Sequence, residues 1–298
     1  MMFLGFYVNL SILLVSYNSR RYLADCLESV RRFAPPGTEV IMADNASSDD
    51  SVDFVAREYP WVRIVRNDRN LGFSAANNLA GKQALGKFIL LLNTDTVMVE
   101  PIGPAVDWLD GHPEYAVLTI NMLDAERIPS ACTGKFPSPL RLMLLRNMLV
   151  APQQFGDKYA YEVDWVQGSF LLIRAEQWRD LGGLDESYFM YVEDVDLCKR
   201  VWDRGLKCAY LPHIRYVHLG GYSVGRFSEV VRGLGIYINH HTSGMRRLLS
   251  WGILCSGCLA RAIFFRTRVL LVGDEKTRTM SRSSWLAFKG LLHMGSSV

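Results

Sequence analysis

Phe88-Ile-Leu-Leu-Leu-Asn93-Thr94-Asp95-Thr96 sets the architecture that the rest of the chain has to fit. Its five leading apolar residues are too few for a helix and too unbroken for a half-exposed strand, so they predict a fully buried strand. Ligands of open parallel sheets bind beyond the carboxyl ends of the strands, where Asn93 and Asp95 fall. A carboxylate at that position suits a hard cation carrying a phosphate. A strand-ending turn, which also favours Asn and Asp, is the alternative at this stage.

The composition indicates a globular protein without a nucleic-acid partner. A chain of 298 residues is long enough for one large domain or two modest ones. Hydrophobic residues at 49% and charged residues at 21% exclude a disordered chain. A formal net charge of +3 is too small to indicate nucleic acid. The six cysteines are scattered in apolar surroundings, which is typical of a reducing compartment rather than of a disulfide framework.

Buried strands and amphipathic helices alternate through the first hundred residues. We expect strands over 10–16, 39–43, 62–66 and 88–92, separated by helices over 19–32, about 50–59 and about 74–85. Further strands are expected over 116–122 and 170–173, with an irregular excursion over 131–161 between them. The order predicts an α/β fold, namely a doubly wound, mainly parallel sheet with helices on both faces.

Polar residues follow the predicted strands at what should be one rim of this sheet. Tyr17, Asp44, Asn77 and Asp95 all fall there. A carboxylate such as Asp44 can accept the N3–H of uracil or thymine, and an aromatic ring such as Tyr17 can cover a base. Polar turns also cap helices in many α/β proteins, but their coincidence at three strand ends favours a binding site. The chain has neither Gly-x-Gly-x-x-Gly nor a Walker lysine loop, which argues against dinucleotide enzymes and P-loop NTPases.

A second group of acids begins the helix predicted to run to about Arg204. Acids at a helix N-terminus interact favourably with its dipole by ~0.3–1 kcal/mol each, but three within four positions exceed what capping requires. Nearby aromatic residues would disfavour the charged form of a carboxylate, which raises its basicity as a general base needs. The three acids are Glu193, Asp194 and Asp196.

Two further places carry residues suited to ligand binding. Gly168 beside Ser169 would let a ligand approach the backbone closely. His218 comes just before two glycines, and it is either a structural histidine or a metal ligand.

Taken in order over about residues 10 to 230, the chain resembles the family 2 glycosyltransferases, and within them the rhamnosyltransferase-like branch that extends bacterial surface polysaccharides. The resemblance implies a GT-A fold, a nucleotide-sugar donor, a divalent Mg or Mn ion, and inversion at the anomeric carbon. The motifs that carry it are Asp44-Asn-Ala-Ser, Asn70-Leu-Gly, Asn93-Thr-Asp95, Gly182-Gly-Leu-Asp-Glu, Glu193-Asp194 and His218.

The resemblance also implies roles for individual residues. Asp194 is similar to the catalytic base, Asp95 to the metal-binding acid of the DxD motif, and His218 to a further metal ligand. Asn93 replaces the first acid of that motif, and a neutral ligand holds a metal less strongly. The residues implied to bind the donor or line the donor and acceptor cleft are Ser16, Tyr17, Asn18, Asp44, Asn45, Asn77, Asn93, Trp165, Gly168, Ser169 and Glu193.

The C-terminal region has the pattern of helices at a membrane surface. Residues 248–259 are almost uncharged but too short to span a bilayer, and arginines flank or interrupt the apolar residues. A helix packed on the catalytic domain with snorkelling arginines is the alternative. We expect a GT-A catalytic domain over 1–240 and an amphipathic, membrane-associated helical region over 241–298. The protein would then be peripheral at the cytoplasmic face of the cell membrane, with a polyprenyl-linked or other glycan acceptor.

The expected function is inverting transfer of a sugar such as rhamnose. The donor would be a dTDP- or UDP-sugar, and the acceptor a hydroxyl of a lipid-linked glycan in cell-surface polysaccharide synthesis. A nucleotidyltransferase should carry a phosphate loop rich in Gly and Lys or Arg after the first strand, which residues 15–19 do not form. A non-catalytic nucleotide-sugar-binding scaffold is the other alternative; the Glu193-Asp194 pair argues against it, and Asn93 argues slightly for it.

Overall fold

The computed structural model describes residues 8–143, 149–220, 226–271 and 273–295, and the chain divides into two compact units. The first unit comprises Met1–Lys135, Leu149–Phe189 and Glu193–Gly220. The second comprises Phe136–Met148, Met190–Val192 and Gly221–Val298. Each unit is described by itself. The predicted domain limits, 1–240 and 241–298, stay a prediction.

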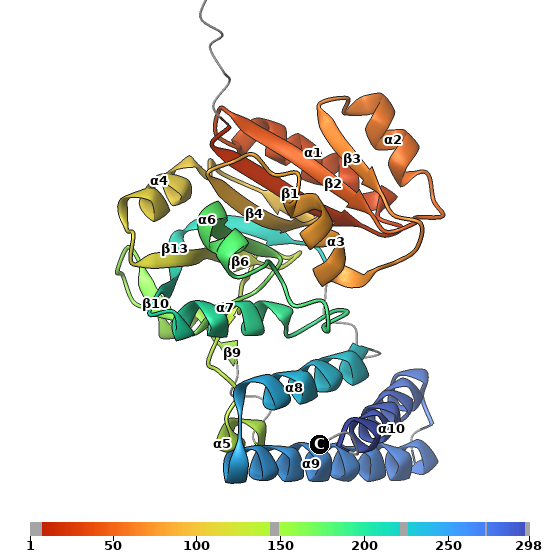
Figure 1. Cartoon of the computed structure of the whole chain (residues 1–298). Helices are drawn as coiled ribbons and strands as arrows, with labels where there is room; N and C mark the ends of the chain where they lie inside the picture. Colours follow the sequence, from red (N-terminus) through yellow and green to blue (C-terminus); the bar gives the residue numbers. More distant parts are fainter. Residues whose placement is uncertain (1–7, 144–148, 221–225, 272, 296–298) are drawn as a thin grey trace, which may run out of the picture. The chain divides into compact units, whose positions relative to one another are not determined.

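Four strands of the ten-stranded main sheet of the first unit are adjacent and parallel (Figure 1). Their order is β3-β2-β1-β4, so the chain reverses its direction of travel across the sheet when it passes from β3 to β4. Right-handed crossovers therefore place the connecting helices α1 and α2 on the face opposite α3, which confirms the doubly wound prediction. The bounds are β1 Leu10–Ser16, α1 Arg20–Phe33, β2 Thr38–Asp44, α2 Ser51–Glu58, β3 Val62–Arg66, α3 Gly72–Gly81 and β4 Phe88–Asn93.

The unbroken apolar run of β4 reflects its central place in the sheet. β4 pairs in parallel with β1 on one side and antiparallel with β12 on the other. The side chains of residues 88–92 are at most 2% exposed. A strand covered on both faces has no solvent side, so it shows no polar alternation.

The remaining strands of the sheet include both parallel and antiparallel pairs. β12 runs antiparallel between β4 and β6, whereas β6 and β13 are parallel to each other. The mainly parallel sheet is thus confirmed for the first four strands and for the β6–β13 pair, with β12 as an antiparallel insertion. The bounds are β5 Thr96–Met98, α4 Gly103–Gly111, β6 Tyr115–Leu123, β10 Tyr161–Val163, β12 Phe170–Arg174, α6 Ala175–Asp180, α7 Glu193–Asp203 and β13 Lys207–His218.

The excursion expected over 131–161 consists of short elements in its described parts, 131–143 and 149–161; residues 144–148 lie outside the described residues. A small separate sheet forms in the order β11-β8-β9, and β7 pairs with the end of β6. The bounds are β7 Pro129–Ser130, β8 Thr133–Gly134, β9 Leu149–Val150, a 3-10 turn at Pro152–Gln154 and β11 Trp165–Val166.

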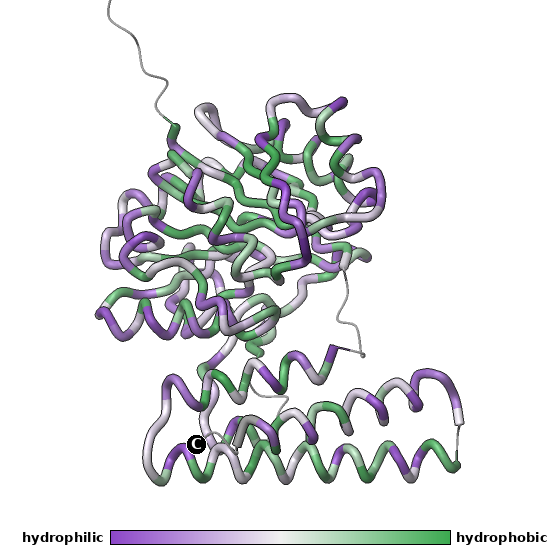
Figure 2. The backbone as a smooth tube through the Cα atoms, turned by 45° about the vertical axis from the view of Figure 1, so that its right-hand side comes forward, coloured by the Kyte–Doolittle hydropathy of each residue, from purple (hydrophilic) through white to green (hydrophobic). Residues whose placement is uncertain are grey.

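The second unit is helical, with α9 in contact with α5, α8 and α10. α9 buries a stripe at helical spacing that includes Leu254, Cys258 and Ala262. It extends beyond the uncharged run 248–259, which was expected to be too short to span a bilayer. Among the described residues, α9 is the one helix with the length and composition to cross a membrane, although 28% of its most apolar window is buried. Figure 2 shows its hydrophobic colouring. The bounds are α5 Pro139–Met143, α8 Phe227–His241, α9 Gly244–Leu271 and α10 Glu275–Gly295.

Candidate active site

Strand register brings the predicted site residues to one rim of the main sheet. Ser16 at the end of β1 is opposite Asp44 at the end of β2, and Val15 is opposite Asn93 at the end of β4. The backbone N–H of Asn93 donates to the carbonyl of Ser169, 3.1 Å away, where β12 begins. Four strands therefore contribute to one continuous edge.

The Asp44 end of this edge is shaped by a folded loop. The Asp44 carboxylate is 4% exposed and accepts hydrogen bonds from the backbone N–H and the hydroxyl of Ser47, at 3.0 and 2.5 Å. Asn18 has a φ of 52°, and its side-chain oxygen accepts from the N–H of Ser48 at 2.8 Å. The Ser16 hydroxyl is buried with no hydrogen-bond partner among the described residues. Tyr17 is 52% exposed, so a ring face is open to a planar base.

Three of the predicted binding residues use their side-chain donors inside the protein. Asn45 donates to the carbonyl of Gly72 at 3.0 Å. Asn77 donates to a carbonyl one turn back in its own helix, 2.9 Å away. The indole N–H of Trp165 donates to the carbonyl of Lys135 at 3.1 Å. The Asn45 and Trp165 donors hold segments around the edge in place, whereas the Asn77 donor bonds within its own helix. Ligand contact by these three side chains stays a prediction.

Asp95 and His218 meet at the other part of the edge. His218 Nε2 and Asp95 Oδ1 are 3.2 Å apart, and the two side chains are 13% and 23% exposed. They come together because His218 ends β13 opposite Thr96 of β5. A carboxylate oxygen and an imidazole nitrogen facing one another are a donor set that fits a divalent cation such as Mn²⁺.

Gly220 leaves the space that the Asp95 carboxylate occupies. A Cβ at position 220 would stand 1.8 Å from Asp95 Oδ2 and 3.5 Å from His218 Nε2. No side chain other than hydrogen fits there without displacing Asp95. The sequence shows a glycine at position 220, but the contact that requires it is with Asp95, 125 residues earlier in the chain.

Asp194 lies at the start of α7, tied to the same edge. Its Oδ2 accepts the N–H of Gly168 at 2.9 Å, and its Oδ1 accepts the N–H of Val195 at 2.8 Å. The preceding residues Tyr191 and Val192 have φ values of 70° and 75°. A β-branched residue in that region is a genuine outlier, and such strain persists where the surrounding structure over-determines it.

Burial raises the pKa of Asp194 above its usual range, and the hydrogen bonds from Gly168 and Val195 oppose the shift. Burial also raises the pKa of the Glu193 carboxyl well above its ordinary value, and the neighbouring Asp194 charge adds to the effect. One oxygen of Glu193 is buried with no hydrogen-bond partner among the described residues. The arrangement favours a protonated Glu193 beside an ionised Asp194 of increased basicity.

Replacing Glu193 by Gln is expected to stabilise the protein at neutral pH, because folding then no longer requires this buried carboxyl group to take up a proton. The folded state binds the Glu193 proton more tightly than the unfolded state. Stability is therefore lost as the pH rises from the ordinary value of 4.5 towards the raised pKa, and the Gln variant escapes that loss. Urea unfolding over a pH series measures the difference between the two proteins. A difference that does not grow with pH would contradict the assignment, and Glu176→Gln on the surface of α6 is the control.

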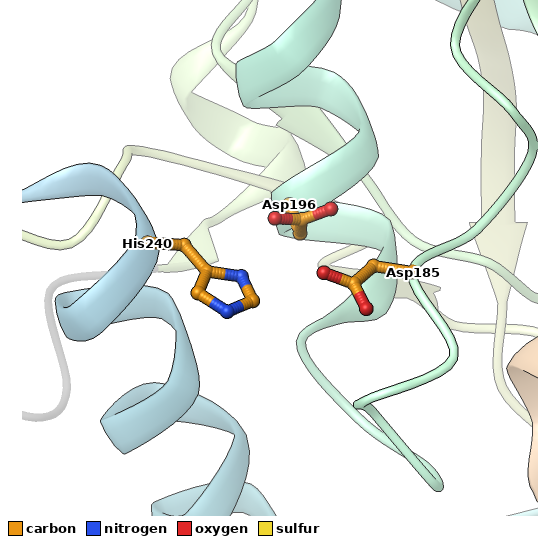
Figure 3. Close-up of side chains that lie close together, drawn as sticks. All are labelled: Asp185, Asp196 and His240. Atoms are coloured by element: carbon orange, nitrogen blue, oxygen red, sulfur yellow. The ribbon is translucent and has the colours of Figure 1, made fainter.

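Asp196 has a structural partner. Its Oδ2 receives Arg200 Nε at 2.7 Å, and the Arg200 guanidinium also donates to the carbonyls of Leu181 and Gly183. Figure 3 shows the carboxylates of Asp185 and Asp196 near one another, and an oxygen of the first lies within 4.8 Å of an oxygen of the second. Figure 3 also draws His240, which belongs to the second unit. Through Arg200, Asp196 thus holds the turn at Gly182 and Gly183, which precedes α7 in the chain.

The structure adds one buried residue to the edge that the sequence did not indicate. The hydroxyl of Tyr216 is 2.8 Å from that of Ser169, and both side chains are at most 2% exposed. Burial raises the pKa of Tyr216 well above its ordinary value. The neutral hydroxyl fixes the segment that carries Gly168. No sequence signal identifies it, because an apolar strand often contains a Tyr.

Residues 11–125 match the family described as Glycosyl transferase family 2. The chain is 28% identical over 240 residues to the N-acetylglucosaminyl-diphospho-decaprenol L-rhamnosyltransferase of Mycobacterium tuberculosis, covering 73% of this chain and 78% of that protein. It is 26% identical to the rhamnosyltransferase WbbL of Escherichia coli, covering 70% and 82%. The mannosyltransferase of Pyrobaculum calidifontis, solved with GDP-Man and Mn²⁺, aligns over 98% of this chain and 88% of its own with a TM-score of 0.59 and 16% identity.

The chain has the GT-A fold that its structural neighbours share. Over residues 11–125 it is similar to the family 2 glycosyltransferases, and over most of its length it is similar to rhamnosyltransferases.

Proposed function

We propose that the chain is an inverting, metal-dependent glycosyltransferase that moves a sugar, rhamnose by similarity, from a dTDP- or UDP-sugar to a hydroxyl of a lipid-linked glycan. The observation that carries this proposal is the single edge where the half-buried carboxylate of Asp194, the Asp95–His218 pair and the exposed ring of Tyr17 occur together. Relatives named as rhamnosyltransferases, one of them for a decaprenol-linked acceptor, support the choice of sugar and acceptor.

The residues divide the reaction between them. Asp44 and Tyr17 bind and cover the base of the donor, and the unpartnered hydroxyl of Ser16 lies beside them. Asp95 and His218 would hold a Mg or Mn ion, which neutralises charge on the leaving diphosphate when bound.

Asp194 takes the proton of the acceptor hydroxyl while the acceptor oxygen bonds to the anomeric carbon and the bond to the diphosphate breaks. One base suffices for a single displacement, and the configuration at the anomeric carbon inverts. Glu193, held neutral, adds no second negative charge next to Asp194 that would repel the departing diphosphate.

We also propose that the protein is peripheral at the cytoplasmic face of the cell membrane. The helical C-terminal region would bring the active site to an acceptor that is itself anchored in lipid. The relative with a decaprenol-linked acceptor and the apolar character of α9 support this location.

Thermal stabilisation by a panel of donors tests the proposed activity. We expect one of dTDP-rhamnose, UDP-glucose and UDP-N-acetylglucosamine to stabilise the protein in the presence of Mn²⁺, by about 2.7 kcal/mol at a hundred times its Kd. GDP-mannose serves as the control with a different base. The anomeric configuration of the product, read by NMR, should be opposite to that of the donor. A folded protein that none of these donors stabilises, or a product of retained configuration, would contradict the proposal.

A further inference from the structure

A hollow of about 550 Å³ lies on the second unit, lined by residues of α9 and α10. Three arginines, Arg266, Arg278 and Arg282, are among its lining residues, and Trp285 stands beside them. Glu275 is the one acidic residue of the lining. Three guanidinium groups and one carboxylate give the hollow a net positive charge that suits an anion.

These three arginines are not used by the fold. Arg261 on the same helix stacks on Phe227 and Phe265, 4.4 and 4.8 Å from the ring centroids. All three of these arginines, at positions 266, 278 and 282, are exposed. Among the residues that the structure describes, they make no ion pair and no side-chain hydrogen bond. Their donors are free for a ligand, and Arg is the side chain that best matches a phosphate.

An uncharged apolar face lies beside the hollow. Met245, Leu249, Ile263 and Leu270 recur on the side of α9 away from its buried stripe, and each is more than half exposed. Arg266 lies between the two sides, three residues after Ile263 and four residues before Leu270. A soluble surface rarely exposes this many large apolar side chains on one side of a helix unless it meets a partner.

The positive charge of residues 226–295 indicates which kind of partner this face would bind. Residues 226–295 contain eleven Lys and Arg and three acids, a formal charge of +8, whereas the whole chain carries +3. Two copies meeting through this face would bring like charges together. A surface of anionic lipid offers opposite charge to the arginines and an apolar boundary to the stripe.

The packing of α9 decides how it would meet the lipid. Although its length and composition suit a span, α9 contacts α8 and α10, and exposed arginines lie along α10. A spanning α9 would draw these charges and Arg261 towards the hydrocarbon, which is costly. Lying in the plane of the interface buries the stripe and leaves the arginines at the headgroups.

We propose that α9 and α10 form a docking surface for anionic lipid, in which Arg266, Arg278 and Arg282 bind the phosphate of a headgroup. The uncharged side of α9 lies at the boundary between headgroups and acyl chains. This inference rests on the proposed membrane location, and it names the lipid class and the residues that select it.

Flotation of the full chain with vesicles tests the site. Wild-type protein should bind vesicles of phosphatidylcholine mixed with phosphatidylglycerol. It should bind vesicles of phosphatidylcholine alone much more weakly. Arg266→Gln, Arg278→Gln and Arg282→Gln combined should weaken binding to the anionic vesicles on the order of a hundredfold. The melting temperature is measured with each variant, since exposed side chains should leave folding unchanged.

A matched variant separates a site from general charge. Arg21→Gln, Arg57→Gln and Arg179→Gln combined remove the same charge from exposed positions of the first unit, and this variant should bind anionic vesicles within about threefold of wild type. Equal weakening by both triple variants, or no weakening by the first, would overturn the lipid site. Dimerisation that requires the α9 stripe, seen by light scattering of Ile263→Asn against wild type, would overturn it as well.

The lipid site and the catalytic proposal fail in different ways. The triple variant in α9 and α10 should keep the donor-induced thermal shift, because its residues belong to the second unit. Vesicle binding without any donor shift would leave the docking surface standing and remove the proposed activity. A donor-induced thermal shift in a protein that does not bind anionic vesicles would support the proposed activity and overturn the lipid docking surface.

Discussion

Asp194→Asn is expected to lower kcat by about 10²- to 10⁴-fold and to leave the Kd for the nucleotide sugar within about twofold, the span typical of a lost general base. An amide cannot accept the proton of the acceptor hydroxyl at neutral pH. Donor binding rests on other residues of the edge, Asp44 and Asp95 among them, so the variant separates chemistry from binding. Single-turnover transfer measures the first quantity, and donor titration by thermal shift measures the second.

The geometry of Asp194 defines the controls for this variant. Both carboxylate oxygens accept backbone hydrogen bonds, from Gly168 and Val195, and Asn can replace only one of these acceptors. A stability loss of roughly 1–3 kcal/mol is therefore expected and has to be measured beside the rate. Asp203→Asn at the end of the same helix should retain wild-type activity, since the Asp203 side chain is 52% exposed and pairs with Lys199. Unchanged turnover in Asp194→Asn would refute the assignment of the base.

The pH dependence of the wild type follows from the same group. The base must be ionised, so kcat/KM should fall as the pH drops through the raised pKa of Asp194. The fall should begin at a higher pH than for an ordinary aspartate, because burial disfavours the charged form.

The order of buried strands and polar turns was sufficient to predict the fold of the first unit. The apolar run of β4 and the polar residues after β1 and β2 predicted both the parallel sheet and the edge where the ends meet. The antiparallel direction of β12 was not predictable, because its short apolar run, Phe170 to Ile173, carries no signal of direction. Its position depends on how the long excursion before it returns to the sheet.

Two further features depend on contacts that are distant in sequence. Asn45 looks like a ligand residue in its motif, yet its amide is bonded to Gly72, 27 residues on. The uncharged run over 248–259, expected to be too short to span a bilayer, ends shortly before Arg261. The helix α9 that contains it continues to Leu271, and Arg261 lies against the aromatic rings of Phe227 and Phe265. Hydropathy along the chain cannot show that a charged group has an aromatic partner.

Asp95→Ala is expected to abolish the Mn²⁺-dependent part of donor binding, raising the Kd for the nucleotide sugar by about a hundredfold or more. Asn93 is neutral, so Asp95 supplies the single carboxylate of the motif, and no second acid there compensates for its loss. Asp95→Asn should keep weak binding that requires more Mn²⁺, because an amide oxygen still coordinates a hard cation. Calorimetric titration of the donor with and without Mn²⁺ measures both variants.

A second variant reaches the same carboxylate without changing it. Gly220→Ala places a methyl group 1.8 Å from Asp95 Oδ2, so the carboxylate must move from its present position beside His218. The Mn²⁺-dependent part of donor binding should therefore fall in Gly220→Ala as well, although every candidate ligand remains. Gly111→Ala has open space around the added methyl group and serves as the control. If Gly220→Ala bound donor and Mn²⁺ like wild type, the orientation of Asp95 towards His218 would not be the one that holds the metal, and the donor site would have to be built around other residues.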